Sequence, residues 1–453
     1  MTMTAVRPIL WLVCAGQFVV ILDVSIVNVA LPSIQRDLGF SAAGLTWVVN
    51  GYLLAFAGFM LLGGRAADLF GHRRTLVAGL SLFSAASLAA GLAATPGMLV
   101  GARVAQGLGG AMLAPATLAV INFRFTGAQR ARAFGAWSAA GGVGGMVGAV
   151  LGGILTTGLS WRWVFLINVP IGAALIAMAL TSLAAAPARA REPLDLVGAL
   201  TGTAGLAAFV YGVMQRAAGP AFTGLLLLAV FVLVEKRFVT HPLVPLRLFA
   251  IRGVAAGNAV LVVFGGIVVA MWFFTSLFMQ NVLGYSALEA GLGQTPAAVT
   301  FVVVARFAAG ARPRVPLGGA AFVAGFGWLA AADAHSTYLG GLLGPTLIVA
   351  FGIGLVFPAL MAVATTAVPP ADTGIASGLA NTSSQVGSAV ALAVLSAAAD
   401  QVFLIAAGLG SAIAAAGLLL LRGAGDENRT RVISLEEPLS SSGLIGSSRE
   451  KGL

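Results

Sequence analysis

The chain has 453 residues, of which 59% are hydrophobic and only 9% are charged, and its mean hydropathy is +0.99. A single soluble core could not bury so much apolar surface, which excludes an ordinary soluble globular protein and predicts a helical membrane protein. The net charge of +10 comes from basic residues spread over many short segments, and this spread argues against a nucleic-acid-binding face.

Apolar runs of about 20 residues, long enough to cross a bilayer as helices, recur along the whole chain. We predict fourteen spans, a count that places both ends of the chain on the same side. They cover residues 9–34, 44–64, 75–95, 97–122, 132–157, 163–186, 194–215, 220–235, 253–280, 287–310, 314–332, 340–366, 373–399 and 402–422.

The distribution of basic residues supports this count, because short cytoplasmic loops are rich in Lys and Arg. With the N-terminus inside, most of the 25 Lys and Arg residues fall in predicted cytoplasmic segments. Arg36, Arg162 and Arg216 fall outside, and Arg103 lies within a span. We therefore predict a multi-pass protein of the cell membrane with both termini in the cytoplasm. Residues 423–453 are polar and aperiodic, which predicts a disordered cytoplasmic tail.

Several kinds of chemistry lack the residues that they need. The only lysines are Lys236 and Lys451, and neither lies in a phosphate-binding loop, so the chain has no ATPase of its own. The three histidines are far apart in predicted loops, which predicts no metal site. No nucleophile elbow is present either, so we predict no enzyme. The remaining classes are a transporter driven by a gradient, a channel and a membrane scaffold.

One acid and one base lie deep in the first half of the chain. Asp23 is 14 residues into the first span and Arg103 is six residues into the fourth, which runs in the opposite direction. At 1.5 Å per residue both lie about 9 Å below the outer surface. We predict that they meet or share a cavity.

Two interpretations of this pair remain open. In one, Asp23 and Arg103 form a fixed ion pair that holds two helices together. In the other, Asp23 takes up and releases a proton, since burial favours its neutral form and the arginine favours its charged form. Ionisable residues inside a membrane are functional by default, which favours the second interpretation.

Small residues form stripes on two further spans. Gly144, Gly148 and Gly152 recur every four residues in the fifth span, where another helix can come very close. In the thirteenth span Gly378, Asn381 and Gln385 continue such a stripe. Tight packing and a cavity-lining or sliding surface both explain these patterns.

Seven further motifs occur along the chain. They are "LDVSIVNVALPSI", "GRAADLFGHRR", "RVAQGLGGAMLAPA", "WRWVFLINVPIG", "HPLVPLRLF", "VLGYSALEAGL" and "GIASGLANTSSQVGSAV". Together, and in this order over residues 7–400, they resemble the fourteen-span drug/proton antiporters of the major facilitator superfamily.

This resemblance implies an all-α major facilitator fold. Residues 1–186 would form the first six-helix half, residues 187–252 two inserted spans with their linkers, and residues 253–422 the second half. It also implies export of a hydrophobic or cationic organic compound, commonly an antibiotic, in exchange for protons, with the proton gradient as energy source and no cofactor. The expected partners are the lipid bilayer, protons and a small lipophilic substrate, and we expect a monomer.

The same resemblance assigns roles to residues that match the family's motifs. Asp23 and Arg103 correspond to its proton-coupling groups. The span-four motif comprises Gln106, Gly107 and Gly109. The gate loop between spans two and three comprises Gly64, Asp68, Gly71, Arg73 and Arg74. The helix-packing motif of span five comprises Gly144, Gly148, Gly152 and Gly153.

The chain also departs from the family pattern. Span five has Ala149 where the family usually has proline, so a bend there would be softer. The loop of the second half that corresponds to the gate loop has no acid, which argues against a symmetric latch.

The substrate and the direction of transport stay open in the sequence. A transporter of the same fold could move a specific metabolite, such as a siderophore or an amino acid, and a scaffold or sensor would move nothing. Asn381, Gln385, Trp272 and Phe273 are candidates to line the cavity, although lipid-facing packing explains the two aromatic residues equally well.

Overall fold

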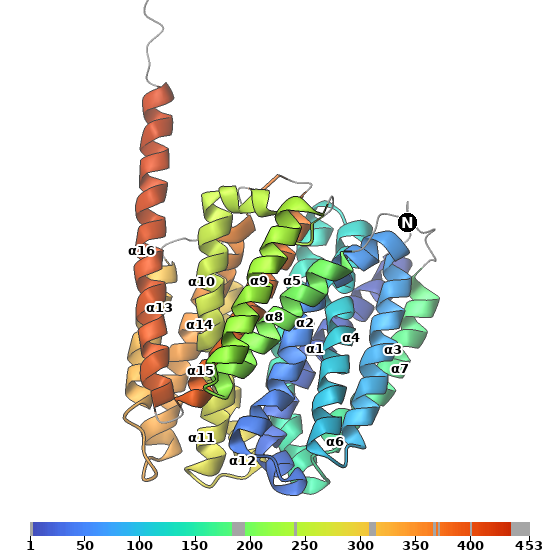
Figure 1. Cartoon of the computed structure of the whole chain (residues 1–453), viewed down its shortest axis with the longest axis vertical. Coiled ribbons are helices and arrows are strands. Elements are labelled where there is room, and N and C mark those ends of the chain that lie inside the picture. The colour runs from blue at the N-terminus through green and yellow to red at the C-terminus, as the bar shows by residue number, and fades with distance from the viewer. Residues whose placement is uncertain are drawn as a thin grey trace, which may run out of the picture.

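The structure is a computed structural model that describes residues 3–183, 195–239, 242–307, 314–365, 368–369, 372–398 and 401–435. These residues form helices and no strand (Figure 1). The first group is α1 (Met3–Leu38), α2 (Ala42–Phe70), α3 (His72–Gly91), α4 (Pro96–Arg124), α5 (Gly127–Gly158), α6 (Trp163–Leu166) and α7 (Asn168–Ser182). The inserted pair is α8 (Leu196–Met214) and α9 (Ala218–Arg237).

The second half begins with η1 (Leu246–Ala250), a 3-10 turn, and also contains two π-helical turns, η2 and η3. Its further elements are α10 (Arg252–Val269), η2 (Ala270–Phe274), α11 (Thr275–Asn281), α12 (Ala287–Phe307), α13 (Arg314–Leu329), η3 (Tyr338–Leu343), α14 (Gly344–Thr365), α15 (Thr373–Ala397) and α16 (Val402–Leu435).

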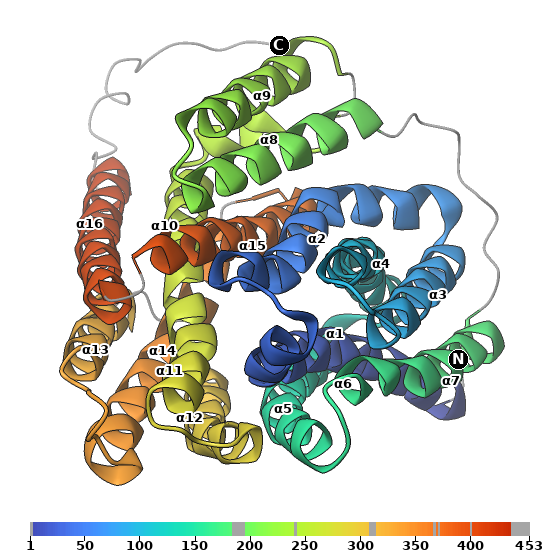
Figure 2. The ribbon, with the colours of Figure 1, turned by 60° about the horizontal axis from the view of Figure 1, so that its bottom comes forward.

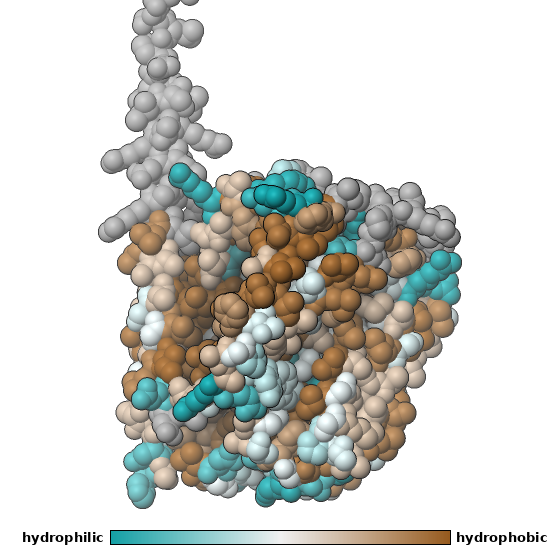
Figure 3. Space-filling view, viewed as in Figure 1, coloured by the Kyte–Doolittle hydropathy of each residue, from teal (hydrophilic) through white to brown (hydrophobic). Residues whose placement is uncertain are grey.

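Taken together, these elements form fourteen helices at the positions of the predicted spans. Within the described residues, twelve are long and apolar enough to cross a membrane, and three of the twelve combine consecutive elements: α6 with α7, α10 with η2 and α11, and η3 with α14. The other two are α13, with 16 residues, and α15, whose polar stripe lowers its hydropathy. Apolar surface covers the middle of the bundle, and most hydrophilic residues lie toward its two ends (Figure 3). The prediction of an all-α membrane fold is confirmed.

Side-chain caps set where several of the spans begin. The side chains of Ser41, Thr95 and Asp195 accept hydrogen bonds from the backbone N–H groups of Gly44, Met98 and Gly198, at the starts of α2, α4 and α8. Each cap satisfies a backbone donor that the first helical turn leaves unpaired. Polar residues at the ends of apolar runs therefore fix the register of these spans.

The helices pack into two halves that touch along two lines. In the first half α1 packs on α5 and α4 packs on α2 and α3, while in the second α10 packs on α15 and α13 packs on α14 and α16. The halves meet where α5 packs on α12 and α2 packs on α15, and α8 lies against both α2 and α15 (Figure 2). This is the arrangement of two six-helix halves with two additional spans that the sequence predicts.

The two ends of the bundle differ in charge. We call the end at which α1 begins the basic end, because Arg65, Arg74, Arg124 and Lys236 lie at helix termini there. It is the upper end in Figure 1. The other end is called the opposite end.

The last helix is longer than the sequence predicts. α16 continues to Leu435, so residues 423–435, which were expected to belong to a disordered tail, are helical. The segment contains no proline, the residue that most strongly ends a helix. Residues 436–453, the rest of the expected tail, lie outside the described residues.

Candidate functional site

Asp23 lies at the centre of a buried polar network in the first half. Its side chain is 0% exposed. Oδ2 accepts a hydrogen bond from Arg103 Nη1 at 2.6 Å, and Oδ1 accepts from Gln106 Nε2 at 2.7 Å and from Asn168 Nδ2 at 2.9 Å. Three donors thus pair both oxygens of this buried carboxyl group. The contact between Asp23 and Arg103 that the sequence predicts is therefore present.

Arg103 is held on every side. Its Nε donates to the backbone carbonyl of Val48 at 2.8 Å and its Nη1 also donates to Gln106 Oε1 at 2.6 Å. The guanidinium lies over the ring of Tyr52, 4.3 Å from the ring centroid, which is a favourable cation–π distance. The buried cation is thus paired by one carboxylate, two uncharged oxygens and an aromatic face.

The network also includes residues that the sequence analysis did not select. Gln106 donates to Ser87 Oγ at 2.7 Å, and Asn168 opens α7 directly after the short α6. Asn168 Oδ1 and the Tyr52 hydroxyl have no hydrogen-bond partner within the described residues. Isolated polar residues inside apolar spans were the available signal for Ser87 and Asn168.

Glycines bring the helices of this network into contact. A Cβ on Gly107 would lie 2.5 Å from the Tyr52 carbonyl oxygen of α2, and one on Gly109 would lie 2.7 Å from the Phe83 nitrogen of α3. Because no side chain fits at these distances, both positions require glycine. The span-four motif therefore positions α4 between α2 and α3 and places Arg103 and Gln106 beside Asp23.

The gate loop connects α2 and α3 at the basic end. Gly71 has φ +90°, a conformation that favours glycine, and this permits the turn. A Cβ placed on Gly64 would make only an ordinary contact with Pro115. A Cβ placed on the preceding Gly63 would overlap the Ala111 backbone. The close approach is thus at Gly63. Within the described residues Arg73 and Arg74 make no ion pair, and the side chain of Asp68 lies outside the described part, so the predicted latch stays a prediction.

The glycine stripe of α5 packs against α1. Cβ atoms on Gly144, Gly148 and Gly152 would lie 2.6–2.8 Å from the carbonyl oxygens of Phe18, Leu22 and Ile26, respectively. The two helices therefore stay in register over three turns. This stripe is a tight packing surface within one half.

Gly153 belongs to a different contact. A Cβ on it would lie 2.5 Å from Leu288 Cα of α12, so Gly153 lies on the line where the two halves meet. On the same line Ala149, which stands at the usual proline position, contacts Gly291 of α12. Between α2 and α15 the contact includes Leu61 and Gly378. Small residues on both lines leave few interlocking side chains that would resist relative movement of the halves.

The four candidates for cavity lining differ in burial. Phe273 is 3% exposed and packs edge-on against Phe274, whereas Trp272, Asn381 and Gln385 are half-buried. Trp272 and Phe273 lie in the π-helical turn η2, a feature that often marks functional sites. The carbonyl oxygen of Trp272 accepts a hydrogen bond from Gln294 Nε2 of α12 at 2.9 Å. Gln294 was not selected from the sequence, and a role of these residues in the cavity stays a prediction.

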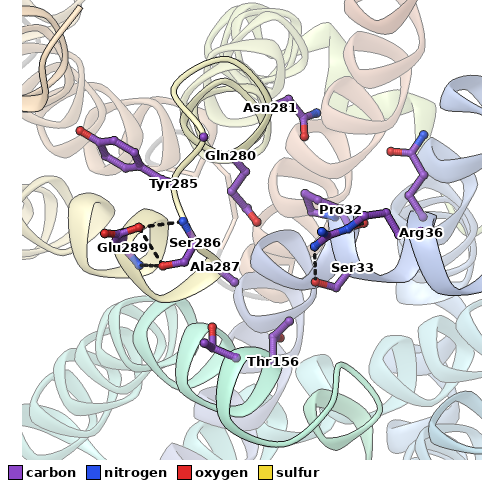
Figure 4. A pocket seen from close by; sticks show the side chains of 13 residues that line it. Pro32, Ser33, Arg36, Thr156, Gln280, Asn281, Tyr285, Ser286, Ala287 and Glu289 are labelled. Atoms are coloured by element: carbon purple, nitrogen blue, oxygen red, sulfur yellow. Dashed lines mark hydrogen bonds between the residues drawn. The ribbon is translucent and has the colours of Figure 1, made fainter.

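A cavity of about 700 Å³ opens at the opposite end, between α1 and α5 of the first half and α11 and α12 of the second (Figure 4). Its lining is largely polar and includes Arg36, Thr156, Gln280 and Glu289. Glu289 accepts hydrogen bonds from the backbone and hydroxyl of Ser286, which is the capping box of α12. The cavity lies at the mouth of the interface between the halves.

An ion pair joins the linker of the second half to the start of α15 at the basic end. Arg247 donates two hydrogen bonds to Asp372, at 2.7 and 2.8 Å. These hydrogen bonds hold the pKa of the Asp372 carboxyl below its usual value. The pair fixes η1 to the helix that meets α2.

Comparisons with known proteins agree with this architecture. Residues 13–392 match the model of the Major Facilitator Superfamily. The chain is 45% identical to the cephamycin export protein CmcT of Amycolatopsis lactamdurans, over 85% of this chain and 83% of that protein. It is 38% identical to the puromycin resistance protein pur8 of Streptomyces alboniger, over 84% and 80%. Among solved structures, the peptide transporter POT in complex with sulfate has a TM-score of 0.70 at 16% identity, over 93% of this chain and 95% of that chain.

Proposed function

Because the chain belongs to the major facilitator superfamily, we propose that it is a secondary transporter that exports an antibiotic or a related organic compound in exchange for protons. The similarity to a cephamycin export protein and to a puromycin resistance protein supports the direction and the class of cargo. Relatives of this kind are transporters, and we propose no enzymatic activity.

The observation that carries the proton coupling is the burial of Asp23 beside Arg103. A bound proton on Asp23 would remove the negative charge that Arg103 Nη1 contacts at 2.6 Å, and Arg103 would then rely on Gln106 Oε1 and the Val48 carbonyl. Release of the proton would restore the ion pair. One titrating group can thus bias two arrangements of α1 and α4.

Gln106 and Asn168 refine this mechanism. Both donate to Asp23 Oδ1, the carboxyl oxygen that Arg103 does not contact. Since Gln106 also bonds Arg103 and Ser87, a change at Asp23 would be passed to α3 as well as to α4. Together with the Val48 carbonyl of α2, the network couples one proton to the packing of five spans.

Movement of the halves would complete the cycle. The contacts between α5 and α12 and between α2 and α15 are the two lines along which the halves would rock. The cavity beside Arg36 and Glu289 would be the outer mouth of the pathway. We propose that the basic end faces the cytoplasm, following the positive-inside rule.

Transport by purified protein in lipid vesicles tests the proposal. Vesicles with known orientation would be loaded with a cephamycin or with puromycin, and loss of the compound would be followed after a pH gradient is imposed without ATP. We expect gradient-dependent export that Asp23→Asn abolishes. Accumulation instead of loss would indicate an importer, and an effect of ATP at constant gradient would contradict the proposed energy source. If neither the unmodified protein nor Asp23→Asn moves either compound, a scaffold would be favoured.

A further inference from the structure

Two buried acids lie at the basic end of the inserted helix pair, where α8 begins and α9 ends. Asp195 caps α8, and its Oδ1 accepts a hydrogen bond from the Gly198 N–H at 2.8 Å. Glu235 lies near the end of α9, and its Oε2 accepts from the Val244 N–H at 3.3 Å. The two residues are only 8% and 3% exposed.

The other oxygen of each carboxyl group has no protein donor. Asp195 Oδ2 and Glu235 Oε1 are buried and without a hydrogen-bond partner within the described residues. A Cβ placed on Gly198 would overlap both atoms, so the two oxygens lie beside the same point and face each other. The absence of a side chain at Gly198 leaves the space that the two carboxyl groups occupy.

Within the described residues, no ion pair is formed by either acid. The charged groups on the elements packed around the two acids are Lys236 and Arg237 of α9, Arg65 of α2, Arg247 of η1 and Asp372 at the start of α15. Of these, Arg247 is bonded to Asp372. The charged or titratable residues Arg189, Arg191, Glu192 and His241 lie outside the described residues. Two ionised carboxylates in a buried, unpaired contact repel each other strongly, and such pairs retain one proton.

We propose that Asp195 and Glu235 form a second proton-binding site, in which one proton joins Asp195 Oδ2 and Glu235 Oε1. The proton enters from the solvent at the basic end. One carboxyl group then carries the O–H and donates a hydrogen bond to the other, which stays ionised. Loss of the proton to solvent breaks that hydrogen bond and leaves two negative charges. The site satisfies both orphaned oxygens with a single proton.

The position of the site gives the inserted pair a role. The shared proton ties the start of α8 to the end of α9, and the Val244 N–H ties Glu235 to the linker. That linker holds α15 through Arg247 and Asp372, while α8 itself packs on α2 and α15. The site therefore stabilises the contact of α2 with α15 when protonated and weakens it when deprotonated. This consequence rests on the proposed transport function, whereas the proton site does not.

Infrared difference spectroscopy of the purified full-length protein tests the site directly. A pH jump from neutral to alkaline should remove the carbonyl signal of one protonated carboxyl group per chain. Asp195→Asn and Glu235→Gln should each abolish this signal, because the new amide donates to the remaining carboxylate and removes the repulsion. Lys236→Gln, a change at an exposed neighbour, should leave it intact, and so should Asp23→Asn, which removes a buried acid in the first half.

The outcomes are distinct. A signal that persists in either Asp195→Asn or Glu235→Gln, or that is absent from the unmodified protein, overturns the proposal. A fully ionised pair that holds a metal cation would give no signal and would overturn it as well. In vesicles, Glu235→Gln should transport with a flattened dependence on the pH at the basic end. If the unmodified protein exports neither a cephamycin nor puromycin, the proposed function fails while the infrared result still decides the proton site.

Discussion

The hydroxyl of Ser25 donates a hydrogen bond to the carbonyl oxygen of Gly145, at 2.6 Å, across the contact between α1 and α5. Gly145 precedes Ala149 by four residues, so its carbonyl is the one that a proline at position 149 would leave without a helical donor. The chain therefore keeps a side-chain donor at the place where its family usually has proline, although its own helix is continuous there.

This relationship predicts that Ala149→Pro destabilises the protein less than a proline at a neighbouring position of α5. A proline inside a helix costs about 3 kcal/mol or more, but Ser25 already satisfies the Gly145 carbonyl, and we expect the loss to be smaller by about 1 kcal/mol, the contribution of one hydrogen bond. The measurement is the thermal unfolding midpoint in detergent, with Val150→Pro as the matched control. In a Ser25→Ala background the advantage of Ala149→Pro over Val150→Pro should disappear. An equal loss for both prolines in the unmodified background would contradict the argument.

A second prediction concerns the close approach of α4 to α2. A Cβ at Gly107 would meet the Tyr52 carbonyl, while one at Gly101 of the same helix would meet nothing within 4 Å. We expect Gly107→Ala to destabilise the protein by about 1–3 kcal/mol, the range for overpacking. Gly101→Ala should have no such cost and should favour the helix by up to about 1 kcal/mol.

Transport gives this pair of variants a second readout. Displacement of Tyr52 would also disturb the ring beneath Arg103, so Gly107→Ala should lose pH-driven export and Gly101→Ala should retain it. Equal unfolding midpoints for the two variants would show that α2 can move aside without cost.

The contact between Asp23 and Arg103 could be predicted because the two residues lie at one depth and are the only strongly charged pair deep in the first half of the chain. Both positions follow from the rise per residue of a straight helix, and a bilayer aligns the spans. Asn168 could not be predicted in the same way, since its place in the network depends on the break between α6 and α7. The facing of Asp195 and Glu235 likewise depends on how the linker after α9 folds back.

The cavity candidates show a related limit. Phe273 is buried and Trp272 is half-buried, although the two residues are adjacent. Successive residues on a helix point in directions about 100° apart, and the π-helical turn at this place shifts them further. When a helix is apolar on nearly all sides, the helices packed around it determine which face is buried. The sequence alone does not show which helices those are.

A third prediction uses the ion pair between Arg247 and Asp372. Because the folded pKa of Asp372 is lowered, the pair stabilises the protein at pH values above the ordinary carboxyl pKa of 3.8, and this contribution is lost as the pH falls through the lower folded value. Asp372→Asn should therefore lower the unfolding midpoint at neutral pH, and the difference from the unmodified protein should shrink in acid. Lys236→Gln, which removes an exposed charge nearby, should show no such trend. A difference that grows with acidity would mean that the pair is not the cause.

The last prediction tests Asp23 and Arg103 as a unit. Asp23→Asn keeps the size of the side chain while fixing its charge at zero, so we expect substrate binding to persist and pH-driven export to stop. Arg103→Ala leaves Asp23 buried without its counter-charge, which costs about 3–5 kcal/mol when a buried pair is broken. In the double variant neither charge remains, so its stability should exceed that of Arg103→Ala. Its transport should be no worse than that of Asp23→Asn, since residues that act together are not additive.

Export and unfolding midpoints would be measured for the two single variants and the double. Arg162→Ala, which breaks an exposed ion pair with Asp37 at the opposite end, is the control and should change neither coupling nor stability by much. Normal pH-driven export by Asp23→Asn would leave Asp23 as one member of a structural ion pair.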